Sequence, residues 1–163
     1  MRWILVSAIA ALLAGGPPAA HGSSVPPGDD PTINRPLTAM ELAEWRIDRA
    51  VDRYGNGEFA AADRLLDQVV EVPEIPDLLR ALALFNRGAA RLQLARYSEA
   101  ILDFDAAEAL SFPRPAQIHL ARGIAWENLR MLDRAAANYV DALSADPTDP
   151  SVRAKVRAFF YKP

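Results

Sequence analysis

Few residues of this chain have the types and spacing that chemistry needs. His119 stands in an Ala- and Leu-rich segment with no acid at metal-ligand spacing, so we expect a structural role for it. Carboxylates such as Asp103, Asp105, Glu41 and Glu44 fall on ordinary helix faces. Cysteine is absent, which excludes thiol catalysis and a lipid-modified cysteine anchor. Because no phosphate loop or nucleophile motif occurs either, we predict no enzyme, no cofactor and no metal site.

Three arginines recur at one place in the sequence pattern. Arg49, Arg87 and Arg122 each come directly before a small residue. They could form a basic ladder that binds carboxylate or phosphate groups of a ligand. The alternative, which we favour, is structural, because an arginine at this place would face the next helix, where Asp103 and Asp105 offer partners.

Composition favours a helical domain. Of the 163 residues, 51% are apolar and 24% are charged, as in globular proteins that fold around a core. Alanine, leucine and arginine are common, whereas valine and isoleucine never form alternating runs, so helices are favoured over strands. The formal net charge is −3 and no basic block occurs, so we expect no nucleic-acid partner.

The N-terminus has the features of a secretory signal. A positive start is followed by an apolar run from Trp3 to Leu13 and then by small residues. We predict a signal peptide over residues 1–22 with cleavage before Ser23; a cut after Ala20 is the other option. A retained anchor is the alternative, but about 11 apolar residues fall short of the ~20 that span a bilayer. We therefore expect an exported protein, periplasmic or secreted, with no stable membrane span after cleavage.

Beyond the signal, the chain divides into a leader and a series of helices. Residues 23–37 are rich in proline and poor in apolar mass, which predicts a flexible leader. Thr38 and Glu41 then form the pattern of a capping box, and we expect Asp77, Ser98 and Asp149 to cap later helices. The expected helices cover 38–54, 58–71, 77–94, 99–110, 115–129, 133–145 and 151–160.

The first six expected helices share one pattern, repeated three times. A small residue in the first helix of each pair lies twelve places before a small residue in the second, and a bulky residue lies three places before the latter. Small residues let two helix backbones approach closely, while the bulky residue closes the end of the hairpin. The three copies are Ala50, Phe59 and Ala62; Gly88, Tyr97 and Ala100; Gly123, Leu132 and Ala135.

This pattern resembles the tetratricopeptide repeat (TPR), a helix–turn–helix unit of ~34 residues. The third copy matches best, through Tyr139, Ala142 and Pro147, and the first is degenerate. The preference for arginine over lysine, 16 to 2, is associated with a bacterial source. The resemblance implies an all-α, TPR-like α-solenoid of three helical hairpins plus a C-terminal capping helix. Its repeats cover 38–147, at about 38–72, 77–111 and 115–147, and the cap with its tail covers 148–163. A partner-binding amphipathic helix is the alternative for this last segment.

The resemblance also implies a function: binding of a protein or peptide through the concave face of the array. The stripe that lines this face by position is mainly apolar, and the lysine–asparagine pattern that clamps a carboxylate in chaperone adaptors is missing. An apolar groove implies a hydrophobic or helical peptide, or occupation by the chain's own terminal helix. The alternative is a self-associating, homo-oligomeric subunit whose groove is filled by another copy. Carried over by position, the groove residues are Ile47, Val51, Tyr54, Phe85, Ala89, Leu92, Leu120, Ile124 and Glu127.

Overall fold

The computed structural model describes residues 37–161. Within this range the chain forms seven helices and no strand, which confirms the all-α fold class. The predicted signal peptide and the leader up to residue 36 lie outside the described residues. None of the described helices is long and apolar enough to cross a membrane. The helices are α2 (Ala39–Gly55), α3 (Phe59–Val70), α4 (Asp77–Gln93), α5 (Tyr97–Ala109), α6 (Pro115–Asn128), α7 (Leu132–Ala145) and α8 (Pro150–Phe160).

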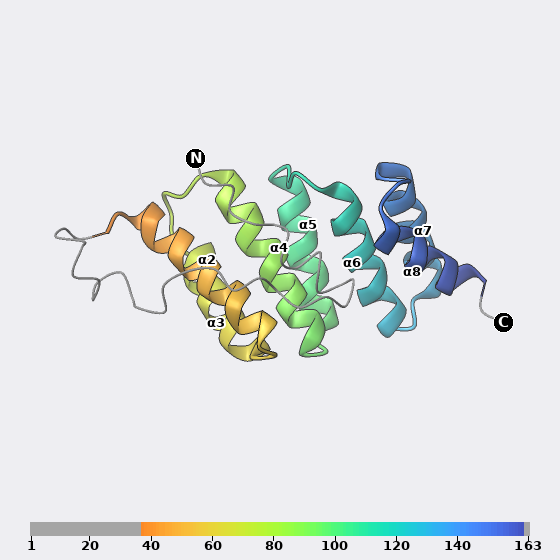
Figure 1. Cartoon of the computed structure of the whole chain (residues 1–163), viewed down its shortest axis with the longest axis horizontal. Helices are drawn as coiled ribbons and strands as arrows, with labels where there is room; N and C mark the ends of the chain where they lie inside the picture. Colours follow the sequence, from red (N-terminus) through yellow and green to blue (C-terminus); the bar gives the residue numbers. More distant parts are fainter. Residues whose placement is uncertain (1–36, 162–163) are drawn as a thin grey trace.

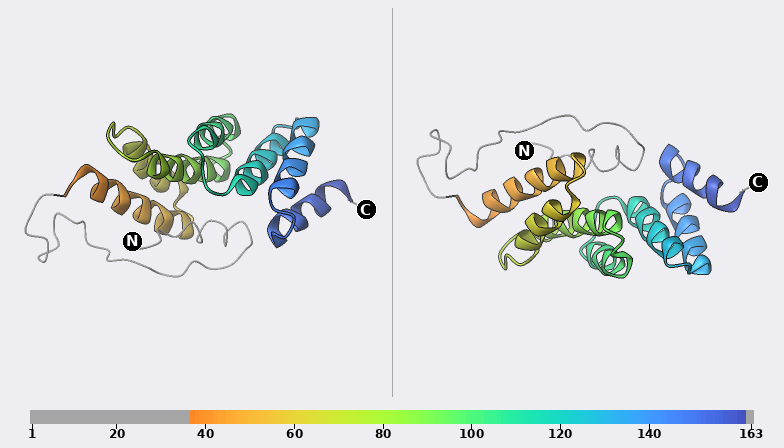
Figure 2. Two further views of the ribbon diagram at one scale, coloured as in Figure 1. Left: turned by 90° about the horizontal axis from the view of Figure 1, so that it is seen from above. Right: turned by 90° about the horizontal axis from the view of Figure 1, so that it is seen from below.

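The helices form three consecutive hairpins, α2–α3, α4–α5 and α6–α7, followed by α8 (Figure 1). The first helices of the hairpins pack against one another in chain order, α2 on α4 and α4 on α6, and α8 continues this series on α6. The second helices, α3 and α5, each fill the space between two members of that series. Views along the other axis show α5 on the side of the array opposite α2 (Figure 2). We call α2, α4, α6 and α8 the inner layer and α3, α5 and α7 the outer layer.

The turn inside each hairpin has the same backbone geometry in all three copies. Gly57, Ala95 and Arg130 occupy the left-handed region, with φ of 79°, 58° and 62°. The amide one residue later donates to the carbonyl five residues earlier, which is the Schellman closure of a helix end. These bonds join Glu58 to Arg53 (2.8 Å), Arg96 to Arg91 (2.9 Å) and Met131 to Trp126 (2.9 Å). The repeat seen in the sequence is therefore also a repeat of backbone geometry, although only the first copy has glycine at the left-handed position.

Two of the predicted helix caps are present. The Thr38 side chain accepts a hydrogen bond from the amide of Glu41 (3.2 Å), and the Glu41 carboxylate accepts one from the amide of Thr38 (2.9 Å). At the other end of the array, the Asp149 side chain accepts from the first amides of α8, beside a proline at the first helical position. Both ends of the array begin a helix with its free amides satisfied.

The caps predicted at Asp77 and Ser98 are wrong. Pro76 is the residue before α4, so Asp77 already lies in the first turn, where its charge still suits the positive helix end. Arg96 is the residue before α5, because the Schellman turn at Ala95 starts the helix at once. In both places the geometry of the preceding turn, rather than a capping side chain, sets where the helix begins.

The small residues of the inner layer receive aromatic rings from the outer layer. A Cβ atom added to Gly88 would lie 2.6 Å from Cε1 of Phe104, and one added to Gly123 would lie 2.6 Å from Cε1 of Tyr139. Both rings are fully buried. The first hairpin has Ala50 in this place, and the residue in the ring's position, sixteen places later as in the other copies, is the smaller Leu66. The glycines are therefore needed where the partner is aromatic.

Helix α8 covers the end of the last hairpin, as the prediction of a capping helix requires. Val152 is fully buried, and Val156 and Phe159 pack against the core of the third hairpin. The Phe159 ring meets the ring of Tyr139 edge-on, with 4.9 Å between the centroids. This packing places Val152, Val156 and Phe159 on the neighbouring helices α6 and α7, while Phe160 stays 47% exposed.

Candidate binding face

Arg87 joins three helices. Its guanidinium lies on α4 and donates to both carboxylate oxygens of Asp103 on α5 (2.6–3.2 Å) and to Asp67 on α3 (2.7 Å). Burial alone would lower the pKa of Arg87, but its hydrogen bond to Asp103 and the charge of that carboxylate, together with those of Asp67, raise it above its ordinary value. The side chain is 14% exposed and that of Asp103 only 4%. Such a fork is a strong, geometrically defined contact, and it lies inside the molecule.

Two further arginines complete this cluster. Arg91, one turn after Arg87, donates to Asp63 (2.9 Å), Asp67 (3.2 Å) and Asp103 (2.9 Å). Arg96 binds Asp63 from the hairpin turn and also pairs with Glu99 (2.5 Å). Because α3 supplies Asp63 and Asp67 and α5 supplies Asp103, the cluster links the first hairpin to the second.

Arg122 makes the equivalent link between the second and third hairpins. It donates to Asp105 (2.6 Å) and Glu108 (2.7 Å) on α5 and to the side-chain oxygen of Asn138 on α7 (2.7 Å). Burial would lower its pKa, but hydrogen bonds to Glu108 and Asp105 raise it. Asp105 is the equivalent of Asp67, 38 residues later, and Asn138 is the equivalent of Asp103, 35 residues later. The geometry of Arg87 and Arg122 fits the structural explanation of the arginine ladder.

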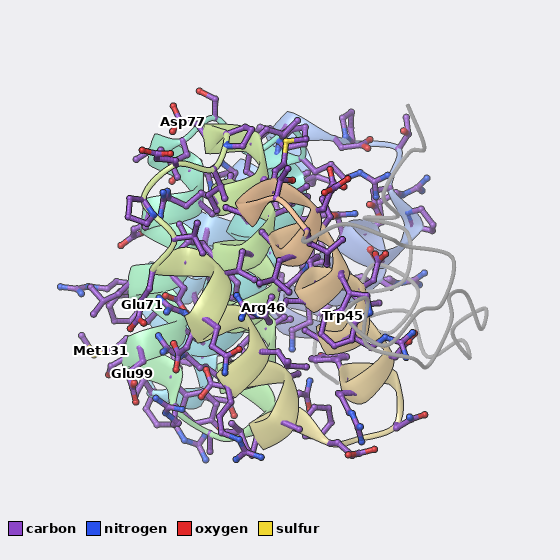
Figure 3. The ribbon with its side chains drawn as sticks, turned by 90° about the vertical axis from the view of Figure 1, so that its left-hand side faces the viewer. Trp45, Arg46, Glu71, Asp77, Glu99 and Met131 are labelled. Atoms are coloured by element: carbon purple, nitrogen blue, oxygen red, sulfur yellow. The ribbon has the colours of Figure 1, made fainter. Side chains whose placement is uncertain are left out.

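Arg49, the first member of the predicted ladder, lies at the first end of the array, where no hairpin precedes it within the described residues. It pairs along its own helix with Asp52 (2.5 Å). Arg87 and Arg122 each bind the residue sixteen places later, Asp103 or Asn138. The residue sixteen places after Arg49 is Leu65 on α3, which has no polar side-chain atom. Figure 3 looks onto this end and shows Trp45 and Arg46 on α2. The ladder is therefore built from two links between hairpins, through Arg87 and Arg122, and a terminal member, Arg49, that pairs with Asp52 of its own helix.

His119 belongs to the second link rather than to a site of its own. Its Nδ1 lies 3.0 Å from the Arg122 guanidinium and its Nε2 lies 3.6 Å from Glu108. The described residues contain no group of three or more histidine, cysteine, aspartate or glutamate side chains arranged to hold a metal ion. His119 therefore lies beside the ion pair of Arg122 and Glu108, which joins the second and third hairpins.

The predicted groove residues fall into two groups. Six of them have at most 8% of their surface exposed and lie in the hydrophobic core, and the other three are half-buried. The six buried residues belong to the clusters in which the helices of both layers pack together. The six core residues are Ile47, Tyr54, Phe85, Ala89, Leu92 and Leu120; the three half-buried ones are Val51, Ile124 and Glu127.

The accessible stripe lies about one residue further along each helix. Asp48, Gln93 and Asn128 are exposed, although their neighbours Ile47 and Leu92 are buried. Residues three or four apart share a helix face, so each inner-layer helix carries one such stripe. We call these residues the inner face: Glu44, Asp48, Val51 and Gly55 on α2; Leu82 and Gln93 on α4; Ile124 and Asn128 on α6.

Glu127 lies beside this face and is held internally. Its carboxylate accepts a hydrogen bond from the Tyr139 hydroxyl (2.7 Å) and pairs with Lys155 of α8 (2.8 Å). Burial, with the hydrogen bond and charge of Glu127, raises the pKa of Tyr139. Position in the sequence indicated a groove residue here, but the contact with Lys155 depends on where α8 packs, and no sequence pattern reports that.

Comparison with known proteins supports the fold. No family model and no curated protein sequence matches the chain. Among solved structures, the TPR domain of Arabidopsis OM64 superimposes with a TM-score of 0.66 at 22% identity, over 77% of this chain and all of that one. The first TPR domain of human RPAP3 gives 0.64 at 20%, over 73% and 90%. Its second TPR domain, in complex with the HSP70 peptide SGPTIEEVD, gives 0.65 at 20%, over 77% and 100%. The fold is therefore a TPR-like α-solenoid.

Proposed function

We propose that this chain is a non-catalytic scaffold that binds a protein or peptide segment on its inner face. The observation that carries the proposal is that the two sides of the inner-layer helices differ in what their side chains contact. Arg87 and Arg122 bind acidic side chains of the outer layer, whereas the inner face presents side chains that are exposed or half-buried. A structural neighbour, the second TPR domain of human RPAP3, is bound to a peptide, which supports the same kind of activity here.

The size of the face suits an extended or helical segment. It runs across three parallel helices, α2, α4 and α6, and is bounded by α8 at its far end (Figure 2). Val51 and Ile124, both half-buried, supply apolar contact at two separate places. Because helix-in-groove recognition relies on several such anchors at fixed spacing, this arrangement favours a protein segment over a small molecule.

Photo-crosslinking from defined positions tests the proposal. A photoreactive phenylalanine analogue placed at Val51 or Ile124 of the full chain in its native host should give a discrete adduct with another protein. Leu102 on α5, which is 67% exposed, is the matched position on the outer layer and should give none. Equal adducts from both layers, or adducts only between copies of this chain, would refute the proposal; the second result would support the self-associating subunit.

We also propose that the scaffold works in the bacterial envelope or outside the cell. The support is the N-terminal sequence, with its positive start, apolar run and small residues before Ser23. Cell fractionation followed by N-terminal sequencing tests this. A periplasmic or secreted product that begins at Ser23 is the expected result, whereas an unprocessed chain retained in the cytoplasm would contradict it.

A further inference from the structure

Helix α8 has the position of a fourth inner-layer helix. It packs on α7 and α6 at the end of the array, as α6 packs on α5 and α4 (Figure 1). Pro150, the first residue of α8, comes 35 residues after Pro115, the first residue of α6. At the same interval, Val152 of α8 is buried as Gln117 of α6 is. The repeat therefore continues into α8 in both sequence and packing.

Helix α8 also repeats the arginine and the small residue of the hairpins. Arg157 and Ala158 follow Arg122 and Gly123 by 35 residues. In all three hairpins the small residue is buried. In α8, however, both residues are exposed, and Arg157 makes no ion pair or side-chain hydrogen bond with the residues that the structure describes. The side of α8 that an outer-layer helix would cover is thus open.

Aromatic side chains extend this open side. Tyr161 comes 35 residues after Trp126 and is 77% exposed, and its neighbour Phe160 is 47% exposed. Trp126, by contrast, is half-buried against the core and covered by Arg134 of the following outer-layer helix. The open side of α8 therefore combines a cation, a small residue and apolar surface, as the covered sides of the preceding inner-layer helices do.

From these observations we infer that α8 receives an outer-layer helix from another protein and forms a fourth hairpin with it. The partner helix lies against Arg157, Ala158 and Tyr161, as α5 lies against α4 and α7 against α6. None of these three residues belongs to the inner face, so the inference goes beyond the proposed function. We call them, with Phe160, the open side of α8.

The hairpins indicate which residue of the partner helix meets Arg157. Arg87 and Arg122 bind the side chain sixteen places later, Asp103 or Asn138. An alanine stands three places before each of these acceptors. Because Arg157 has no carboxylate partner among the described residues, the acceptor that also balances its charge is an acid.

The small residue of α8 sets the size of the next side chain. Gly88 faces the ring of Phe104, whereas Ala50 has Leu66 in the ring's position. Since α8 has alanine here, as the first hairpin does, the residue after the acid is leucine rather than an aromatic. The partner helix thus carries the pattern Ala-x-x-Asp/Glu-Leu on one face.

A second copy of this chain does not supply such a helix. The pattern Ala-x-x-Asp/Glu-Leu occurs nowhere in the 163 residues. Helices α5 and α7 have the related patterns that end in Asp103-Phe104 and Asn138-Tyr139, and both already pack in their own hairpins. Two α8 helices would also bring like charges together at Arg157. A separate protein therefore matches this surface better than a second copy.

A stapled peptide tests the inference. The probe has the sequence of residues 96–110 with Phe104→Leu, which gives it the pattern Ala-x-x-Asp-Leu. A hydrocarbon staple between the positions of Leu102 and Ala106, which are exposed in α5, keeps this short peptide helical. The control peptide carries Asp103→Lys in addition. In fluorescence anisotropy, the full chain should bind the probe at least about tenfold more tightly than the control, because only the probe offers Arg157 a charge-assisted hydrogen bond.

Matched variants of the chain locate the binding. Arg157→Glu should reverse the preference between the two peptides, and Ala158→Trp should weaken the probe at least about tenfold by filling the space of the incoming helix. Arg64→Glu makes the same charge change at an exposed arginine of α3 and should change the affinity less than about twofold. Circular dichroism should show all three variants to be folded, since each changes an exposed side chain.

Three results would overturn the inference. The first is that the probe does not bind, or binds no better than the control. The second is an equal loss in Arg157→Glu and Arg64→Glu, which would show attraction to net charge alone. The third is a dimer of the full chain, detected by sedimentation, that Ala158→Trp dissociates, because a second copy would then cover the open side of α8. Crosslinks from Val51 and Ile124 test the inner face separately and are expected in any of these cases.

Discussion

Two interfaces join the three hairpins, and they fill the same space with different chemistry. Between the first and second hairpins, Arg91 faces Asp63, and both side chains are at most 12% exposed. In the second interface, Trp126 takes the place of Arg91, 35 residues later, and Ile101 takes the place of Asp63, 38 residues later. Ile101 is buried in the core cluster against which Trp126 packs, and Arg134 covers the Trp126 ring at 4.6 Å. The array thus tolerates a buried ionic cluster or an apolar pair, provided that the space is filled.

The link through Arg87 and Arg122 is common to both interfaces, but its surroundings differ. Asp103, the main partner of Arg87, has 4% of its side chain exposed, whereas Asp105 and Glu108, the acidic partners of Arg122, have 51% and 39% exposed. Water can solvate the latter acids when their arginine is removed, but it cannot reach Asp103 without opening the core. The same residue type at the same repeat position should therefore contribute unequally to stability.

The largest expected effect comes from removing these arginines one at a time. Arg87→Ala should lower the free energy of unfolding by about 3–5 kcal/mol, because it removes the fork that binds the buried Asp103, which then keeps only Arg91, and also the contact with Asp67. Arg122→Ala should lower it by about 1–2 kcal/mol, because its partners are exposed or neutral. Urea denaturation followed by circular dichroism measures both. A ligand-binding ladder predicts the reverse pattern, in which Arg87→Ala weakens binding and leaves the unfolding transition in place.

Exchanging the chemistry of the interfaces sharpens the comparison. Ile101→Asp places a carboxylate in the apolar interface and should lower the free energy of unfolding by about 3 kcal/mol. Adding Trp126→Arg supplies the partner found in the first interface and should restore at least about 1 kcal/mol of that loss. The control is Trp126→Arg alone, which should itself destabilise the protein. If the double variant loses the sum of the two single losses, the interfaces are not interchangeable in the way described here.

The hairpins on either side of the second interface should respond alike to crowding of their glycines. Gly88→Ala and Gly123→Ala push a methyl group against the rings of Phe104 and Tyr139 and should each lower the free energy of unfolding by about 1–3 kcal/mol. In a Phe104→Leu background, Gly88→Ala should be nearly neutral, since the first hairpin has alanine opposite leucine. Thermal unfolding measures all three. An undiminished loss in the leucine background would show that the ring is not the cause.

The smallest expected effect concerns the hairpin turns. Ala95→Gly and Arg130→Gly should each raise the free energy of unfolding by about 0.5–1 kcal/mol, because their φ of 58° and 62° disfavours residues with a Cβ atom. Gly57→Ala in the first turn is the matched opposite and should lower it by about 1 kcal/mol. No atom lies within 4 Å of a Cβ added to Gly57, so backbone conformation alone decides this result. A destabilising Ala95→Gly would contradict the shared turn geometry.

Much of the fold could be predicted from the sequence because its determinants are local and repeated. The constant twelve-residue offset between small residues, such as Gly88 and Ala100, follows from one hairpin geometry, and the structure confirms three hairpins and a cap. The caps expected at Asp77 and Ser98 were wrong, and the second of these helices begins two residues before its expected start, since a preceding turn can begin a helix without a capping side chain. Local rules do not contain that information.

The candidate site was harder to predict because it depends on packing between repeats. The sequence pattern placed Ile47 and Leu92 on the groove side, but in the structure they lie in the core, and their neighbours Asp48 and Gln93 are exposed instead. A rotation of one residue per helix changes the face from apolar to partly acidic. Likewise, Asp103 was foreseen as a partner for the arginines, whereas the contact of Arg87 with Asp67 on the preceding hairpin required the three-dimensional arrangement.

The central claim is that the arginines of the inner layer hold the hairpins together and leave the inner face to a partner. A double-mutant cycle on Arg87 and Asp103 tests it most directly, with Arg87→Met, Asp103→Leu and the pair compared by urea denaturation. The two residues should be coupled by at least about 2 kcal/mol, and the double variant should be more stable than Arg87→Met alone, because it removes the buried carboxylate together with the arginine that bound it in a fork. Additivity of the two single effects within about 0.5 kcal/mol would contradict the account.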